Sequence, residues 1–178
     1  EHGGEEEKPL YFTSIIDDIE VAFTYDFIPD YPVEEVDSEV DIVAIIHGPS
    51  GWQKEVPLQS DTRLGDHFTI KFPLELDEFD DIISDIENEL EVRHPTEQNV
   101  YDLVIEARVS TRAYTGKVWV EDSFVQPMEI SVGRGTLNWD NQLDLAQRRY
   151  HEGYYGGFSY KHVGHFDYII TLIEDNIL

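Results

Sequence analysis

Apolar and polar residues alternate along most of the chain, which is the pattern of half-buried β-strands. In Asp18–Phe27 the odd positions carry Ile, Val, Phe, Tyr and Phe, and the even positions are polar or small. The same pattern predicts further strands. They are Val36–His47, Trp52–Leu58, Phe68–Leu76, Tyr101–Val109, Lys117–Val125, Met128–Val132, Thr136–Trp139 and Phe158–Leu172.

One segment changes to the period of a helix. Its apolar residues recur at spacings of three and four, which predicts an amphipathic helix at about residues 77–91. These residues are Phe79, Ile82, Ile83, Ile86 and Leu90. Asp77 is the expected N-cap, because a short acidic side chain accepts bonds from the free N–H groups of a helix start. Gln142–Arg149 follows neither period and is expected to be a helical turn or a loop.

Eight or so strands with one helix predict an all-β fold, an antiparallel β-sandwich with the helix inserted between two strands. Both Ig-like and jelly-roll-like arrangements fit this pattern. Residues 1–9 are interpreted as an acidic N-terminal tail. Residues 10–178 are interpreted as one sandwich domain, because 178 residues suit a single domain and no linker or repeat interrupts them. The candidate strand Phe158–Leu172 exceeds the usual strand length, so it either bends at Gly164 or stays extended.

The composition restricts the partners. The chain has 38 acidic and 12 basic residues, with a formal net charge of -26. Such a surface repels phosphate backbones, so no nucleic-acid partner is expected. It also repels anionic lipid, so membrane association is expected only through an anchor outside this sequence. The chain has no cysteine, which excludes disulfides, thiolate metal sites and cysteine nucleophiles.

Several segments share their hydrophobic pattern and turns with one family. They are Leu10–Thr13 followed by Asp18–Phe27, Gly51–Trp52 with Val56–Leu58, Phe68–Glu89, and Tyr101–Phe124. Over about residues 10–145 the chain resembles an uncharacterised archaeal ectodomain family, described only as a domain of unknown function. The resemblance implies a β-rich domain at an archaeal cell surface and brings no catalytic residues. Family members typically carry flanking membrane segments, and this sequence contains neither.

Acidic clusters make calcium the candidate ligand, because calcium takes six to eight oxygen ligands. The candidate ligands are Asp17, Asp18, Asp140 and Asp144. The stretch Asn138–Asp144 lacks the central glycine and closing glutamate of an EF-hand loop, so that motif is rejected. A solvated acidic surface is the alternative interpretation.

No motif predicts catalysis, and no catalytic residue is assigned. Ser50 lies in a turn before a strand, unlike the serine of a nucleophile elbow. His162 and His165 would point to opposite faces of one strand, so packing or surface roles are expected instead of zinc or copper binding. A hydrolase with paired carboxylates stays a third alternative, because the separation of two carboxyl groups is not readable from sequence.

Aromatic and apolar residues gather near both ends of the chain and are the candidate subunit interface. They are Leu10, Tyr11, Phe12, Ile15, Tyr154, Tyr155, Phe158 and Tyr160. Aromatic residues are enriched at protein interfaces. Ordinary core packing of a long strand explains the C-terminal ones equally well.

The leading hypothesis is a non-enzymatic archaeal surface protein that self-assembles into a filament, tube or layer. A start without methionine favours a processed, extracellular protein. Subunits would join when a terminal segment adds a strand to a neighbour. Leu10–Ile16 is the favoured donor, because Tyr160–Leu172 carries too much apolar area to lie free. The alternative is a monomeric surface ectodomain that binds a partner protein or a glycan.

Overall fold

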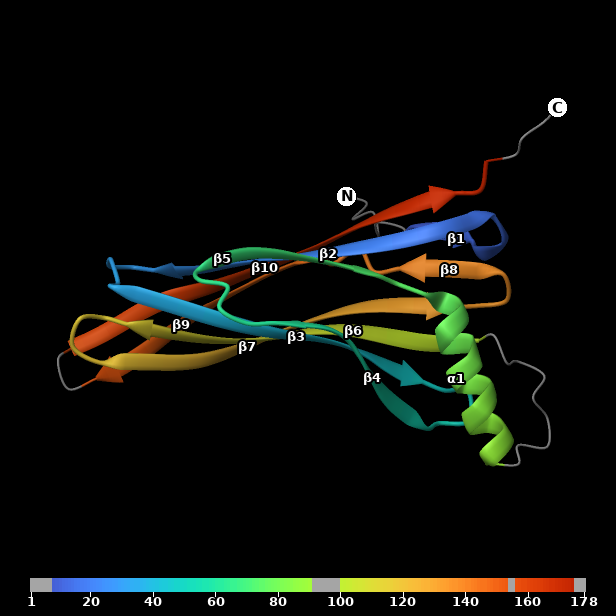
Figure 1. The fold of residues 1–178 in the computed structure, drawn as a ribbon, viewed down its shortest axis with the longest axis horizontal. Coiled ribbons are helices and arrows are strands. Elements are labelled where there is room, and N and C mark those ends of the chain that lie inside the picture. The colour runs from blue at the N-terminus through green and yellow to red at the C-terminus, as the bar shows by residue number, and fades with distance from the viewer. Residues whose placement is uncertain (1–7, 91–99, 154–155, 175–178) are drawn as a thin grey trace, which may run out of the picture.

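The computed structural model describes residues 8–90, 100–153 and 156–174 as two packed antiparallel sheets with one inserted helix (Figure 1). The predicted all-β sandwich is therefore confirmed. Sheet A has the order β1-β8-β7-β6-β3-β4, and sheet B has the order β5-β2-β10-β9. The strands of sheet A are β1 (Leu10–Phe12), β3 (Glu35–His47), β4 (Gln53–Asp61), β6 (Tyr101–Tyr114), β7 (Trp119–Val132) and β8 (Thr136–Trp139). Those of sheet B are β2 (Ile16–Pro29), β5 (His67–Pro73), β9 (Asp144–Gly153) and β10 (Gly156–Leu172).

The inward positions of both sheets fill one core that is rich in aromatic rings. Phe23 and Phe166 from neighbouring strands of sheet B lie 4.9 Å apart between ring centroids. Trp139 is fully buried, stacks on Tyr168 at 3.9 Å, and donates its indole N–H to the sulfur of Met128. Burying each large apolar side chain stabilises the fold by about 1.5–3 kcal/mol, so this interior accounts for the regular alternation.

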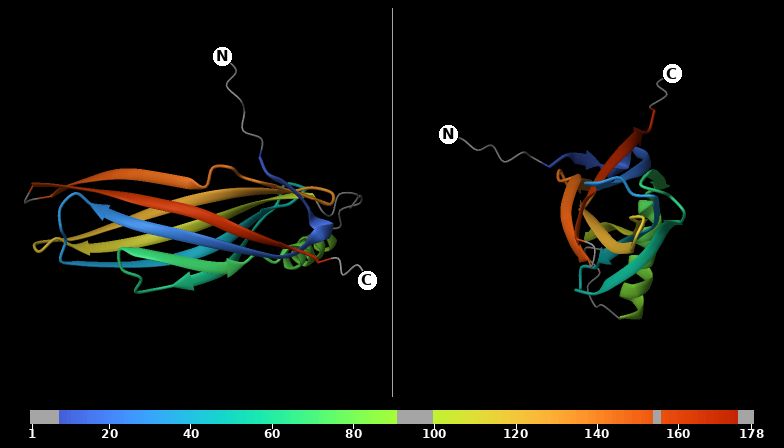
Figure 2. Two further views of the ribbon diagram at one scale, coloured as in Figure 1. Left: turned by 90° about the horizontal axis from the view of Figure 1, so that it is seen from above. Right: turned by 90° about the vertical axis from the view of Figure 1, so that its left-hand side faces the viewer.

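Helix α1 (Leu76–Glu89) covers one end of the sandwich (Figures 1 and 2). Phe79 and Ile83 are its buried apolar residues. The expected N-cap is wrong: Glu75 occupies that position without a side-chain hydrogen bond, and Asp77 lies inside the first turn. There the carboxylate still interacts favourably with the helix dipole.

A buried carboxylate holds α1 against the turn between β3 and β4. Glu87 is 6 % exposed and accepts a hydrogen bond from Trp52 Nε1 at 2.8 Å. It also accepts from Ser50 Oγ at 3.0 and 3.1 Å to its two oxygens. Ser50 therefore has a structural partner in this fold.

Two strand predictions differ from the structure at sheet edges. The segment expected to be a helical turn or loop belongs largely to β9, which pairs with β10 at the edge of sheet B as described. An edge strand needs few apolar residues, so its pattern is weak. The two predicted strands on either side of Pro127 form one strand, β7. At Pro127 this strand pairs only with β6, so the missing N–H costs no ladder bond on the open side.

The long C-terminal strand runs through the middle of sheet B. β10 has 17 residues and pairs with β2 on one side and with β9 on the other. It passes Gly164 without a register shift. A Cβ at Gly164 would lie 2.0 Å from Gln126 Oε1, so only glycine leaves room for the facing sheet. At its far end Leu172 pairs with Ile16, close to where β2 begins.

The N-terminal strand joins the two sheets. β1 pairs with β8 in sheet A, and the short 3-10 helix η1 (Thr13–Ile15) leads directly into β2 of sheet B. Pro9, assigned to the tail, already accepts a hydrogen bond from Trp139 N at 3.0 Å. Residues 1–7 of the predicted tail lie outside the described residues.

Candidate functional site

A polar trough of about 650 Å³ lies on the outer face of sheet A, where β3, β6 and β7 run side by side. Its residues lie on the strand segments next to the β6–β7 turn. This turn is at the end of the sandwich remote from α1 (Figure 1). Two rows of outward side chains border the trough across the three strands. One row is Asp37, Arg112 and Glu121, and the other is Glu39, Ser110 and Ser123.

The floor of the trough lies between these rows. Ser38, Thr111 and Asp122 occupy neighbouring positions on β3, β6 and β7. Because side chains alternate along a strand, these three point into the sandwich and leave their backbone on the outer face. The hydroxyls of Ser38 and Thr111 are accordingly buried, at 1 % and 3 % residue exposure.

An exposed tryptophan lies next to the trough, on the same strand as its β7 residues. Trp119 is 44 % exposed and lies on the same face as Glu121. The Arg112 guanidinium stacks 4.5 Å above the Trp119 ring, and the Tyr114 ring lies 5.1 Å from it. A stacked guanidinium keeps its N–H groups in the ring-parallel plane, from which they can donate to a ligand.

Below the floor, a chain of hydrogen bonds crosses the core from one sheet to the other. Tyr25 Oη lies 2.7 Å from His162 Nδ1 and 2.9 Å from Thr111 Oγ1. Thr111 is in turn bonded to Ser38 at 2.9 Å. At the other end His162 Nε2 lies 2.7 Å from Asp122 Oδ2. His162 itself is completely buried.

The protonation states of His162 and Asp122 fix which atom donates and which accepts in each of these hydrogen bonds. Burial lowers the pKa of His162 despite the neighbouring Asp122, so the ring is neutral. Burial alone would raise the pKa of Asp122, but hydrogen bonds from His162 and Tyr160 outweigh it and lower the pKa. The ionised Asp122 therefore accepts from Nε2–H, and Nδ1 accepts from the Tyr25 hydroxyl. Thr111 then donates to Tyr25, and Ser38 donates to Thr111.

This constellation contains acid, histidine and hydroxyl groups, but its chemistry is that of a structural network. Burial raises the pKa of Tyr25 far above its ordinary value, which opposes formation of a nucleophilic phenolate. The two histidines separate as strand parity predicts: His162 is buried, whereas the side chain of His165 is 47 % exposed and lies 2.6 Å from Asp144.

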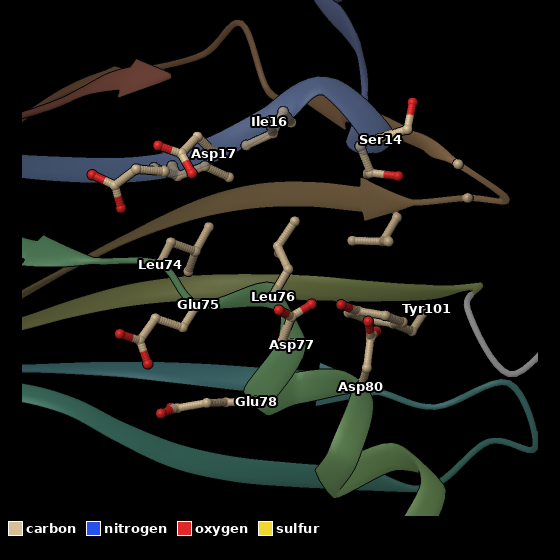
Figure 3. A pocket seen from close by; sticks show the side chains of 16 residues that line it. Ser14, Ile16, Asp17, Leu74, Glu75, Leu76, Asp77, Glu78, Asp80 and Tyr101 are labelled. Carbon is tan, nitrogen blue, oxygen red and sulfur yellow. The ribbon is translucent and has the colours of Figure 1, made fainter. Parts of the chain in front are cut away.

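A second cavity, of about 580 Å³, lies between η1 and the start of α1 and is strongly acidic (Figure 3). Six carboxylates line it: Asp17, Asp18, Glu75, Asp77, Glu78 and Asp80. In Figure 3, Asp77 and Asp80 lie beside the buried Tyr101 ring, whereas Glu75 and Glu78 point away from it. Burial raises the pKa of Asp80, and a hydrogen bond with Glu75 raises that of Glu78.

The four candidate calcium ligands have different surroundings. Asp17 and Asp18 line the acidic cavity. Asp140 instead accepts a hydrogen bond from the Gln142 backbone N–H at 2.9 Å, and Asp144 contacts His165. Within the described part of the chain, no group of three or more His, Asp or Glu residues could hold a metal ion. Calcium binding stays a prediction.

The candidate interface residues divide into exposed and buried ones. Leu10, Phe12 and Ile15 are 55 %, 58 % and 45 % exposed, so they are accessible in the folded chain. Tyr11 is half-buried, with its hydroxyl 3.2 Å from that of Tyr168.

The two described C-terminal interface candidates are at least partly buried. Phe158 is half-buried, and Tyr160 is 4 % exposed and packs 5.2 Å from Phe27. In this fold Tyr160 is a core residue and not a surface available to a partner. Tyr154 and Tyr155 lie outside the described residues.

Comparisons with protein families, curated proteins and solved structures found no match. No family model matches the chain. Neither a curated protein nor a solved structure matches it either. Among the described residues, no helix is long and apolar enough to cross a lipid bilayer. The resemblance to the archaeal ectodomain family therefore stays an expectation.

Sequence reasoning missed both the trough and the network beneath it. Ser38, Thr111 and His162 all occupy inward positions of their strands, where the alternation calls for apolar residues. Polar residues at inward positions need buried hydrogen-bond partners, so their presence in the sequence indicates a buried network. No pattern in the sequence indicates the trough, because outward polar residues are ordinary on any strand.

Proposed function

We propose that this protein is a non-enzymatic domain of the archaeal cell surface, which recognises a polar extracellular ligand through the trough of sheet A. The trough carries the proposal, because it presents donors and acceptors from three paired strands. Side chains on strands hold a binding geometry more accurately than side chains on loops. Among the described residues, every strand of the two sheets is paired with another strand of the same chain, which supports a domain that functions as a monomer.

The non-enzymatic part of the proposal rests on the buried network. Its hydroxyl, histidine and carboxylate are satisfied by one another, and His162 has no exposed surface. A catalytic base must reach the proton that it removes from a substrate. The extracellular part rests on the resemblance to archaeal ectodomains.

Co-sedimentation with envelope fragments of the producing organism tests this function. Arg112→Glu places a negative charge in the trough and is expected to lower the bound fraction at least fivefold. Lys71→Glu is the matched control, because it changes the charge equally on an exposed position of β5 in sheet B. Equal losses in both variants would show general repulsion and contradict the role of the trough. Thermal unfolding of each variant confirms that the fold is intact.

Self-assembly by strand exchange is a second candidate, favoured by the properties of β1. This strand has only three residues, lies at the edge of sheet A, and exposes Leu10 and Phe12. Such a strand could leave its own β8 and pair with the β8 of a second copy. β10 is a poor donor, because it is paired on both sides.

A disulfide distinguishes exchange from an intact monomer. Leu10 and Asn138 are paired across β1 and β8, and the chain has no native cysteine. Oxidised Leu10→Cys/Asn138→Cys protein is expected to give a covalent ladder on a denaturing gel if subunits exchange β1. Only monomers, together with dispersed particles in negative-stain micrographs, would remove this candidate.

A further inference from the structure

The trough lies over the middle of sheet A, and this position restricts how a ligand can bind there. Its floor includes β6, whose backbone is already paired with β3 on one side and β7 on the other. An added peptide strand needs an open sheet edge, and β6 offers none; within the described part of the chain, β7 is unpaired in this region only on the side away from β6. A ligand that lies over β6, in the middle of the trough, is therefore recognised by side chains.

Those side chains offer donors and acceptors in close alternation. Arg112 is flanked in its row by Asp37 and Glu121, and the parallel row places Ser110 between Glu39 and Ser123. Neighbouring strands lie about 4.8 Å apart, so donors and acceptors recur at this spacing across the trough. A ligand that bears many hydroxyl groups satisfies both kinds, because each hydroxyl donates one hydrogen bond and accepts others.

The charge of the site excludes anionic forms of such a ligand. Three carboxylates and one guanidinium border the trough, on a chain with a net charge of -26. A phosphorylated or carboxylated ligand would meet repulsion both locally and at long range. A hydroxyl-bearing ligand without acidic groups avoids this repulsion.

The tryptophan supplies the remaining contact. Trp119 is fixed by Arg112 and Tyr114 and is still 44 % exposed, so part of its ring is open to solvent beside the polar rows. The C–H face of a sugar ring packs on such a surface while its hydroxyls reach the polar side chains. Trp combines a large apolar ring with little conformational entropy to lose on binding.

From these observations we infer that the trough binds a neutral glycan, with Arg112 as the principal donor and the adjoining Trp119 as the stacking surface. The inference rests on the proposed function and names its ligand class. The volume of about 650 Å³ lies within the range of ligand sites and suits an oligosaccharide of a few rings.

Calorimetric titration with neutral hexaoses of glucose, mannose and galactose tests the inference, with hexagalacturonate as the anionic counterpart of the galactose compound. At least one neutral hexaose is expected to bind. Trp119→Ala is expected to raise the Kd about tenfold or more, which for a weak ligand means that no binding is detected. Tyr150→Ala is the matched control, because Tyr150 is also an exposed aromatic residue but lies on β9 of the other sheet.

The outcomes separate this inference from the function on which it rests. Stronger binding of hexagalacturonate than of the galactose hexaose, or equal losses in both variants, would overturn the neutral-glycan assignment. If no hexaose binds but envelope binding still depends on Arg112 and is destroyed by protease, the ligand is a protein and only the further inference fails. If envelope binding is also insensitive to Arg112→Glu, the proposed function fails with it.

Discussion

Removing the hydroxyl of Tyr25 tests whether the buried hydrogen-bond chain stabilises the sandwich. Tyr25→Phe keeps the aromatic ring, which packs 5.3 Å from Phe68 and 5.7 Å from Phe124. Only the polar atom between His162 and Thr111 is lost. The substitution therefore separates hydrogen bonding from apolar packing better than a truncation to alanine would.

The expected cost follows from which partners are left without a bond. His162 Nδ1 loses the donor that the described residues give it, at 2.7 Å, in a residue with no exposed surface. Thr111 can turn its hydroxyl toward Ser38, so its loss is smaller. One orphaned buried acceptor costs about 1–3 kcal/mol, and we expect a decrease of about 2 kcal/mol in the free energy of unfolding. For a chain of this length, that lowers Tm by about 4–8 °C.

Urea unfolding followed by circular dichroism measures the free energy, and a thermal scan measures Tm. Tyr31→Phe is the control, because Tyr31 is 69 % exposed and its hydroxyl meets water. Its change is expected to stay within about 0.5 kcal/mol. If Tyr25→Phe lowers the free energy of unfolding no more than Tyr31→Phe does, the buried hydrogen bonds contribute nothing to stability and the reasoning is refuted.

Four further predictions follow from named contacts. The lowered pKa of His162 means that the unfolded chain binds its proton first, so stability is complete above about pH 6.5 and is lost as the pH falls through the folded pKa. His162→Gln is expected to flatten that part of the stability–pH curve, and an unchanged slope would contradict the assignment. Glu87→Ala leaves the N–H of the half-buried Trp52 without its acceptor and should cost about 1–3 kcal/mol in urea unfolding, with a smaller loss for Glu87→Gln. Gly164→Ala brings a Cβ against Gln126 and should cost about 1–3 kcal/mol, and an unchanged Tm would show that the facing sheet yields freely. Calcium is expected to raise Tm by relieving the repulsion between carboxylates in the acidic cavity. An equal rise with sodium at matched ionic strength would show that general charge screening, and not calcium binding, is the cause.

The sequence predicts those elements whose burial is one-sided and regular. β2 carries an apolar residue at every inward position from Ile19 to Phe27, and the helix keeps its stripe through Phe79 and Ile83. β9 lies at an edge and has few apolar residues, so its alternation is faint. Pro127 looks like a strand end until the open side of β7 is known.

The candidate site was harder to predict, because it depends on which strands are neighbours. Tyr25 and His162 are 137 positions apart in sequence and meet only through sheet pairing and the packing of the core. The trough needs the register that aligns Asp37 with Arg112 and Glu121. Strand order carries this information, and alternation along single strands does not. For the same reason Tyr160 looked like an interface residue, although it fills the core.

The pairing of Leu172 with Ile16 determines how the fold would carry mechanical load. A force that separates these two residues acts across the strand pair and opens β2 from β10 one residue pair at a time, starting at the end near α1. Such unzipping needs little force, because each pair yields before the next is loaded. A force that draws both residues the same way leaves this pairing unstressed. If both ends were held at one surface, the domain would carry little tension through its core, and the trough at the opposite end would keep its shape.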